Sequence, residues 1–189
     1  REQHPGGRPL KERRYKESYR IVTRTDKRAG QKRREAEYAG DRFQYPEGTP
    51  GPRSRTLRLI VPLALYWLAA LAYLKTAGIT GRCMYALPPF LLGLFPGVYG
   101  LMGFVAMLRA PEKMTVVQRE SGVGRLMRCG LGCGIFAALG TAGGVVCLCL
   151  ARAWADAWHE PTLTGVCAAA GWALFLSARK DYRALEKTV

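Results

Sequence analysis

Apolar residues gather in four long stretches that contain no Asp, Glu, Lys or Arg, and polar segments separate these stretches. The stretches are residues 59–74, 83–108, 129–151 and 161–178. A helix needs about 20 predominantly apolar residues to cross the hydrocarbon core of a bilayer. The pattern therefore predicts an all-α integral membrane protein with four transmembrane helices. We place these helices at residues 57–77, 85–108, 126–151 and 162–178.

The first 56 residues have a different composition, with 16 basic and 8 acidic side chains. We expect a disordered start and then a small antiparallel β-hairpin within residues 19–45, because runs of β-branched and aromatic residues alternate there with turn formers. The sequence is also compatible with a third short strand at 42–45. Two or three strands alone are marginal in water. The hairpin should therefore lean on a partner, on the membrane surface or on the loop at 114–121.

Lys and Arg alternate between rich and poor segments along the chain. The N-terminal region through Arg58 holds 17, and the loops and the tail at 179–189 that follow hold 2, 5, 1 and 4. We place the chain in the cytoplasmic (inner) membrane. The positive-inside rule then predicts that both termini and the second loop lie in the cytoplasm. Trp154 and Trp158 fit an outer interfacial belt, and we expect Asp156, His159 and Glu160 to face water.

Small residues recur on one face of the third predicted helix, at a mean spacing close to one helical turn. This stripe comprises Cys129, Cys133, Ala137, Gly140, Gly144 and Cys147. Small side chains let two helices approach closely in lipid. The matching surfaces are Gly93 and Gly97 on the second helix and Gly165 on the fourth. We predict that these residues pack helices together; the alternative is that they line a narrow pathway.

Six cysteines raise the question of thiol chemistry. Cys147 and Cys149 are two residues apart, so on a helix they point about 200° away from each other. Cys129 and Cys133 share a face, but near the predicted reducing side. We therefore expect that the fold needs no intramolecular disulfide.

No motif indicates a cofactor, a metal site or an active site. The acidic residues and both histidines lie outside the four charge-free stretches. His159 and Glu160 have no second histidine nearby, and the glycines around Gly132 lack the third glycine of a dinucleotide fingerprint. We expect neither cofactor nor metal and no enzymatic activity.

The basic N-terminal region is predicted to contact anionic lipid headgroups, or a partner, rather than nucleic acid. A negatively charged inner leaflet attracts each nearby basic residue by about 1 kcal/mol. The candidate contact residues are Lys11, Arg13, Arg14, Lys16, Lys32, Arg33 and Arg34.

These observations favour a small non-enzymatic scaffold or accessory subunit. Such a protein packs through its small-residue helix faces and presents the basic element to a protein partner or to a second copy of the chain. An oligomeric channel or transporter component is the alternative, and membrane thiol-disulfide chemistry is the third interpretation.

Overall fold

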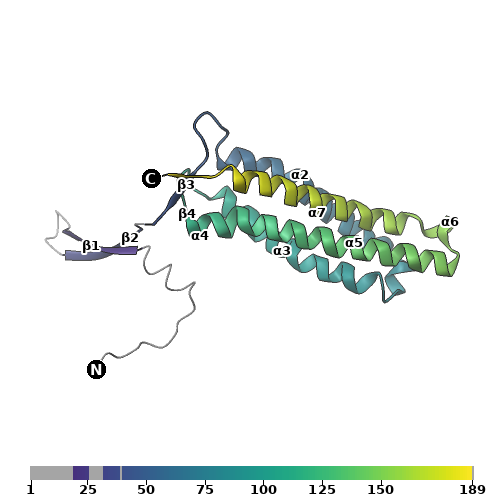
Figure 1. The fold of residues 1–189 in the computed structure, drawn as a ribbon. Coiled ribbons are helices and arrows are strands. Elements are labelled where there is room, and N and C mark those ends of the chain that lie inside the picture. Colours follow the sequence, from purple (N-terminus) through teal and green to yellow (C-terminus); the bar gives the residue numbers. More distant parts are fainter. Residues whose placement is uncertain (1–18, 26–31, 39, 189) are drawn as a thin grey trace, which may run out of the picture.

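The computed structural model describes residues 19–25, 32–38 and 40–188 of the chain. The predicted disordered start, residues 1–10, lies outside these ranges. Four long helices run side by side along most of the molecule (Figure 1). They are α2 (Pro52–Thr76), α3 (Leu87–Leu108), α5 (Arg125–Ala151) and α7 (His159–Arg183). All four are long and apolar enough to cross a membrane, as the charge-free stretches predicted.

Two short elements extend the third span towards its N-terminal side. They are α4 (Val116–Arg119) and the π-helical segment η2 (Glu120–Gly124). Together with α5 they form one continuous helical segment of 36 residues that contains the apolar span. Thr115 begins it with a capping box, in which the Thr115 hydroxyl and the Gln118 side chain satisfy two main-chain N–H groups. This helix therefore starts about ten residues before the predicted boundary at residue 126.

Helices α2 and α7 also extend beyond the predicted charge-free spans. Helix α2 begins at Pro52, and proline suits the first turn of a helix because its missing N–H has no partner there. Helix α7 begins at His159 and continues to Arg183. Absence of charge locates only the apolar part of a helix, so charged turns at either end were left out.

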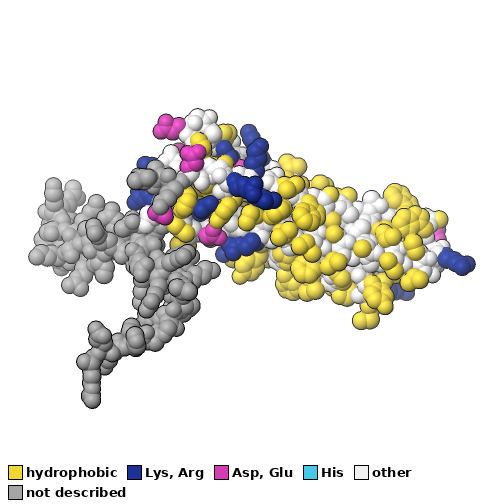
Figure 2. All heavy atoms as spheres, in the orientation of Figure 1, with side chains coloured by type: hydrophobic (Ala, Val, Ile, Leu, Met, Phe, Trp, Pro, Cys, Tyr) yellow, Lys and Arg dark blue, Asp and Glu magenta, His cyan; other side chains and the backbone are white. Residues whose placement is uncertain are grey.

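A belt of exposed apolar side chains surrounds the bundle. Val61, Leu68, Phe95 and Leu150 are each more than 65% exposed. Figure 2 shows apolar side chains along the bundle, whereas most Lys, Arg, Asp and Glu side chains gather at one end. A contiguous apolar surface of this extent is unsuited to water. Four helices that are long and apolar enough to cross a membrane, together with this surface, indicate the class of multi-pass membrane proteins.

Two buried clusters hold the helices together. One is centred on Met107, Met114 and Leu126, near the charged side chains. The other contains Tyr66 and Phe90. The Tyr66 hydroxyl donates to the carbonyl oxygen of Gly93 at 2.8 Å, so its polar atom is satisfied inside the apolar bundle.

Strands occur only at one end of the bundle among the described residues. Strands β1 (Tyr19–Thr25) and β2 (Lys32–Tyr38) form the expected antiparallel hairpin, with Tyr19 opposite Tyr38. The third strand, β3 (Arg42–Gln44), joins a different sheet. It lies between β4 (Met114–Thr115) and β5 (Glu186–Thr188), antiparallel to both.

The three-stranded sheet gathers distant parts of the chain at one end of the helices (Figure 1). We call this end, with β3, β4, β5, the start of α2 and the end of α7, the charged end. The opposite end contains the short helices η1 (Thr80–Arg82) and α6 (Trp154–Ala157). We call it the tryptophan end. The four long helices alternate in direction, so the chain returns after α7 to the end at which α2 began. This is why β3 and β5 meet.

Candidate functional site

Arg119 forms the centre of a cluster of charged and aromatic side chains at the charged end. Its guanidinium carbon lies 4.3 Å from the ring centroid of Phe43 in β3 and 3.9 Å from that of Tyr182 in α7. The guanidinium also donates to the main-chain carbonyl of Tyr182 at 3.4 Å. A cation over an aromatic face contributes roughly 0.5–2 kcal/mol, depending on desolvation. Arg119 therefore ties β3 to the last turn of α7.

Glu120 joins the π-helical segment to the same cluster. Its Oε1 accepts a hydrogen bond from the Tyr182 hydroxyl at 2.6 Å, and its Oε2 pairs with Arg128 at 3.1 Å. Gly122, on the same segment, packs on Met107 so closely that a Cβ there would lie 2.7 Å from the Met107 sulfur. The segment is thus held by α7 through Glu120 and by α3 through Gly122.

Arg55, in the first turn of α2, makes a parallel set of contacts. Its Nη1 lies 3.0 Å from Oδ1 of Asp181, and its Nε donates to the carbonyl oxygen of Pro50 at 3.1 Å. Its guanidinium also covers the ring of Tyr45 at 4.3 Å. The side chains of the ion pair are only 15% and 16% exposed. This shielded pair offsets the unfavourable position of a carboxylate at a helix C-terminus.

The Tyr45 side chain is 6% exposed, and its hydroxyl has no hydrogen-bond partner within the described part of the chain. Burial raises the pKa of Tyr45 to about 12, and the Asp181 carboxylate adds to this effect while Arg55 opposes it. The phenol is therefore held in its neutral form. Arg119 thus holds β3 against the bundle through Phe43, and Arg55 holds the next residue after the strand, Tyr45.

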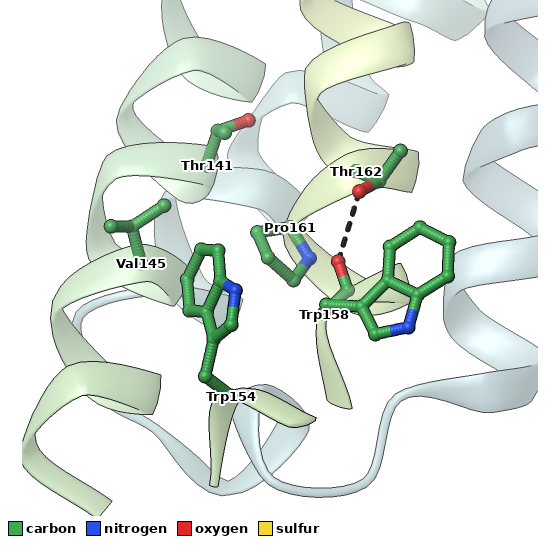
Figure 3. A pocket seen from close by; sticks show the side chains of 6 residues that line it. All are labelled: Thr141, Val145, Trp154, Trp158, Pro161 and Thr162. Carbon is green, nitrogen blue, oxygen red and sulfur yellow. Dashed lines mark hydrogen bonds between the residues drawn. The ribbon is translucent and has the colours of Figure 1, made fainter. Parts of the chain in front are cut away.

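The tryptophan end contains a pocket of about 310 Å³ between α5 and α7. Figure 3 shows the two indole rings of Trp154 and Trp158 on either side of Pro161. The other residues that line the pocket are Thr141, Val145 and Thr162. The Thr162 hydroxyl donates to the carbonyl oxygen of Trp158 at 2.9 Å. Both tryptophans are about half exposed, which suits a membrane interface.

The prediction that Glu160 faces water is wrong, because Glu160 is 3% exposed. Its carboxylate accepts main-chain hydrogen bonds from Gly78 at 3.1 Å, Ile79 at 3.3 Å and Thr80 at 2.8 Å. The Thr80 hydroxyl also donates to it, and lies 3.1 Å from the Tyr73 hydroxyl. The loop after α2 folds over the start of α7, so that these donors replace water around the carboxylate.

Five residues of the small-residue stripe are buried: Cys129, Cys133, Ala137, Gly140 and Gly144. The thiol of Cys133 donates to the carbonyl oxygen of Gly93 in α3 at 3.6 Å. A Cβ on Gly140 would lie 3.1 Å from Cβ of Phe90 in α3. Gly144 instead faces the Thr80 and Pro161 side chains at ordinary contact distance, and Cys147 is half-buried. The stripe is occupied by contacts within the chain.

The matching glycines face several different partners. A Cβ on Gly93 would lie 3.1 Å from Cβ of Phe136, and a Cβ on Gly97 would lie 2.9 Å from the Tyr66 ring in α2. Gly165 is only partly buried, and its nearest neighbour is Thr141 at 3.8 Å. Helix α3 therefore uses its glycines against both α2 and α5.

The tightest helix contact involves glycines that the sequence analysis missed. A Cβ on Gly171 in α7 would lie 2.5 Å from the main-chain nitrogen of Gly134 in α5. A Cβ on Gly130 would lie 2.7 Å from the main-chain nitrogen of Phe175. The spacing of Gly130 and Gly134 is itself a small-xxx-small signal. The stripe predicted from the sequence lies on the neighbouring face of the same helix.

The basic candidates lie mostly beyond what the structure shows. Lys11, Arg13, Arg14 and Lys16 are outside the described residues. Lys32, Arg33 and Arg34 lie on β2, opposite Thr25, Arg24 and Thr23 of β1. Contact with anionic lipid therefore stays a prediction.

Cys83 and Cys147, which are far apart in sequence, lie close enough for their thiols to interact. The chain forms no disulfide in this structure among its described cysteines.

The chain matches no protein-family model, no curated protein and no solved structure.

Proposed function

We propose that this multi-pass membrane protein is a non-enzymatic scaffold or accessory subunit that fixes its basic N-terminal region at the cytoplasmic face of the inner membrane. The observation that supports this is the position of β3 at the centre of a sheet built from three distant segments. Strand β2 ends at Tyr38 and β3 begins at Arg42, so only three residues join the basic hairpin to the docked strand. The hairpin is thereby kept close to the bundle.

The alternation of Lys and Arg supports placing the charged end at the cytoplasmic leaflet. In that orientation Lys32, Arg33 and Arg34 lie within reach of anionic headgroups. These residues, with the more N-terminal Lys11, Arg13, Arg14 and Lys16, form the proposed lipid or partner contact. The proposed partner is a protein or a second copy of the chain.

Packing in the middle of the bundle favours a scaffold over a pathway through a single chain. The backbones of α5 and α7 touch at Gly134 and Gly171, and the Tyr66 side chain fills the space beside Gly97. An oligomeric channel or transporter component is the alternative, and its pathway would have to run between copies.

A comparison of two matched variants tests the role of the docked strand. Phe43→Ala with Arg119→Gln removes the stacked pair that docks β3. Phe175→Ala with Arg179→Gln removes a looser arginine–phenylalanine pair on α7, in which the guanidinium carbon lies 5.8 Å from the ring centroid. Each full-length protein is purified from native membranes in mild detergent, and copurifying proteins are quantified.

We expect a stoichiometric partner to accompany the parent and the α7 control, and to be lost from the β3 variant. Equal retention by both variants would contradict a role for the docked strand. A pure homo-oligomer that conducts ions in liposomes would instead support the channel alternative.

The lipid contact is tested with the full-length protein in nanodiscs, with and without anionic lipid. Trypsin cleavage at Lys32, Arg33 and Arg34 should be slowed only by the anionic discs. Protection should fade at 1 M salt, where the Debye length falls to about 3 Å from about 10 Å at 0.1 M. Equal cleavage in both kinds of disc would contradict the headgroup contact.

A further inference from the structure

The loop between α2 and α3 lies directly on α5 at the tryptophan end. A Cβ on Gly143 would clash with the carbonyl oxygen of Tyr85 and lie 3.0 Å from the main-chain nitrogen of Ala86. One residue further along, a Cβ on Gly144 would lie 3.5 Å from the Thr80 methyl group. Only glycine at 143 allows the loop backbone to approach so closely, so α5 determines where the loop sits.

Cys83 and Cys147 both lie on this contact surface. Cys147 is four residues after Gly143, and residues at this spacing share one helix face. Cys83 is held in the loop, because its N–H donates to the Thr80 carbonyl at 3.1 Å and its own carbonyl accepts from Ala86 at 3.2 Å. The two thiols interact with each other. Both residues are partly exposed, so a reagent can reach them.

We propose that Cys83 and Cys147 form a reversible disulfide at the tryptophan end, by exchange with a disulfide-containing oxidant on that side of the membrane. The oxidising character of that side rests on the orientation given under the proposed function. The juxtaposition of the two thiols does not depend on it.

The exchange balances with one oxidant disulfide per protein. The Cys83 thiolate attacks one sulfur of the oxidant, which forms a mixed disulfide and releases one thiolate. The Cys147 thiol then loses its proton, and its sulfur attacks the Cys83 sulfur and displaces the second thiolate. The two cysteines together lose two electrons, the oxidant gains them, and the two protons convert the released thiolates to thiols.

Local hydrogen bonds suit Cys83 to the first attack. Burial raises the pKa of the Cys83 thiol. Hydrogen bonds with the main chain at Tyr85 and Ala86 and with the Cys147 thiol lower it by a larger amount, so the pKa lies below its ordinary value. A larger thiolate fraction makes the sulfur more reactive at neutral pH.

The other cysteines are placed differently. Cys149 is exposed and lies two residues beyond Cys147, so it points away from the loop. Cys129, Cys133 and Cys167 are buried. Cys149 therefore provides a matched control on the same helix.

A disulfide here would fasten the loop that supplies the main-chain donors of Glu160. These donors are the N–H groups of Gly78, Ile79 and Thr80, just before Cys83. Closing the bond between the loop and α5 would restrict the separation of α2 and α3 from α5. Oxidation should then raise the thermal midpoint of the bundle.

The experiment treats the full-length protein in detergent with oxidised glutathione and counts free thiols by maleimide-polyethylene glycol gel shift after denaturation. The reduced chain has six thiols. We expect two fewer after oxidation, with recovery on adding dithiothreitol. Cys149→Ser should still lose two thiols, whereas Cys83→Ser and Cys147→Ser should lose none to an intramolecular bond.

Retention of all six thiols in the oxidised parent would overturn the proposal, as would loss of the response in Cys149→Ser. A mixed glutathione adduct that never resolves would also overturn it, and intact-mass measurement detects such an adduct. The same count is then repeated on whole cells that are first reduced with dithiothreitol, so that the pair is open, and then treated with a membrane-impermeant maleimide. Failure to block Cys83 from outside, together with pairing in detergent, would contradict the orientation and leave the disulfide intact.

Discussion

At the charged end, Arg55 and Arg119 stack on aromatic rings and Arg55 also pairs with a carboxylate, whereas at the tryptophan end one carboxylate is surrounded by main-chain donors. Arg55 and Arg119 reach their partners through long side chains. Glu160 is instead enclosed by a loop that folds over it. Side-chain contacts between separate segments let the charged end gather β3, β4 and β5. Main-chain contacts to one carboxylate make the tryptophan end compact.

Between the two ends, the backbones of α5 and α7 are in direct contact. Gly134 and Gly171 leave no room for a side chain between α5 and α7. Lipid-facing helices gain little from burying apolar area against each other, because lipid is equally apolar. Close packing and satisfied polar groups must therefore supply the stability, and substitutions should rank by how much of either they remove.

The largest effect is expected from Gly171→Leu. The new side chain would meet the Gly134 backbone, which cannot move aside, and overpacking of this kind costs about 3 kcal/mol. The measurement is the thermal midpoint and the monodisperse fraction in detergent. Ala169→Leu, at an exposed position on the same helix, should leave both nearly unchanged. Equal effects of the two variants would contradict the tight α5–α7 contact.

A smaller loss is expected from Glu160→Gln at the tryptophan end. The neutral amide keeps one acceptor but loses the charge-assisted hydrogen bonds to Gly78, Ile79 and Thr80. A hydrogen bond to a charged group contributes about 1.5–3 kcal/mol. We expect a drop of about 2 kcal/mol in the free energy of unfolding. Asp156→Asn, at an exposed site of the same end, should change the free energy of unfolding by only a small fraction of this amount.

Arg119→Gln should loosen β3 without disturbing the helices. Loss of stacking on Phe43 and Tyr182 should cost roughly 1 kcal/mol. The readout is the rate of chymotrypsin cleavage after Phe43 and Tyr45, which should rise several-fold. Arg179→Gln, over Phe175, should leave this rate unchanged. An unchanged rate in Arg119→Gln would show that the sheet alone holds β3.

Double-mutant cycles should separate the two ion pairs of the charged end. Arg55 and Asp181 are shielded, so we expect a coupling of about 1 kcal/mol that changes little with salt. Arg128 and Glu120 are more exposed, and their coupling should be about 0.3 kcal/mol and fade at high salt. Equal couplings would show that burial does not distinguish the two pairs.

The effect that vanishes at neutral pH concerns Tyr45 and alkaline conditions. Its pKa is about 12 in the folded protein, above the ordinary 10.0, so the folded state holds the phenolic proton more tightly. The resulting stability is complete below pH 10 and is lost as the pH rises towards 12. Tyr45→Phe should flatten the fall of the thermal midpoint in this window. Tyr85→Phe, at an exposed site, should not alter it.

Much of the helical fold could be predicted from the sequence because membrane spans obey local rules. Four charge-free stretches were enough to locate α2, α3, α5 and α7, since a helix satisfies its backbone hydrogen bonds within the segment itself. The antiparallel pairing of β1 with β2 could also be predicted from the sequence. The small-residue stripe located one face of α5, but not the neighbouring glycines that touch α7.

Only the tertiary structure decided which residues meet at the two ends. Arg119 and Tyr182 are 63 residues apart, and Gly78 and Glu160 are 82 apart. No local pattern links such positions, because their proximity results from how four helices stack and where each loop folds back. The pairing of β3 with β4 and β5, the burial of Glu160 and the contact between Cys83 and Cys147 all follow from that stacking. The sequence by itself determined the spans, through the energetics of apolar segments in a bilayer, and the packing of the spans determined the sites.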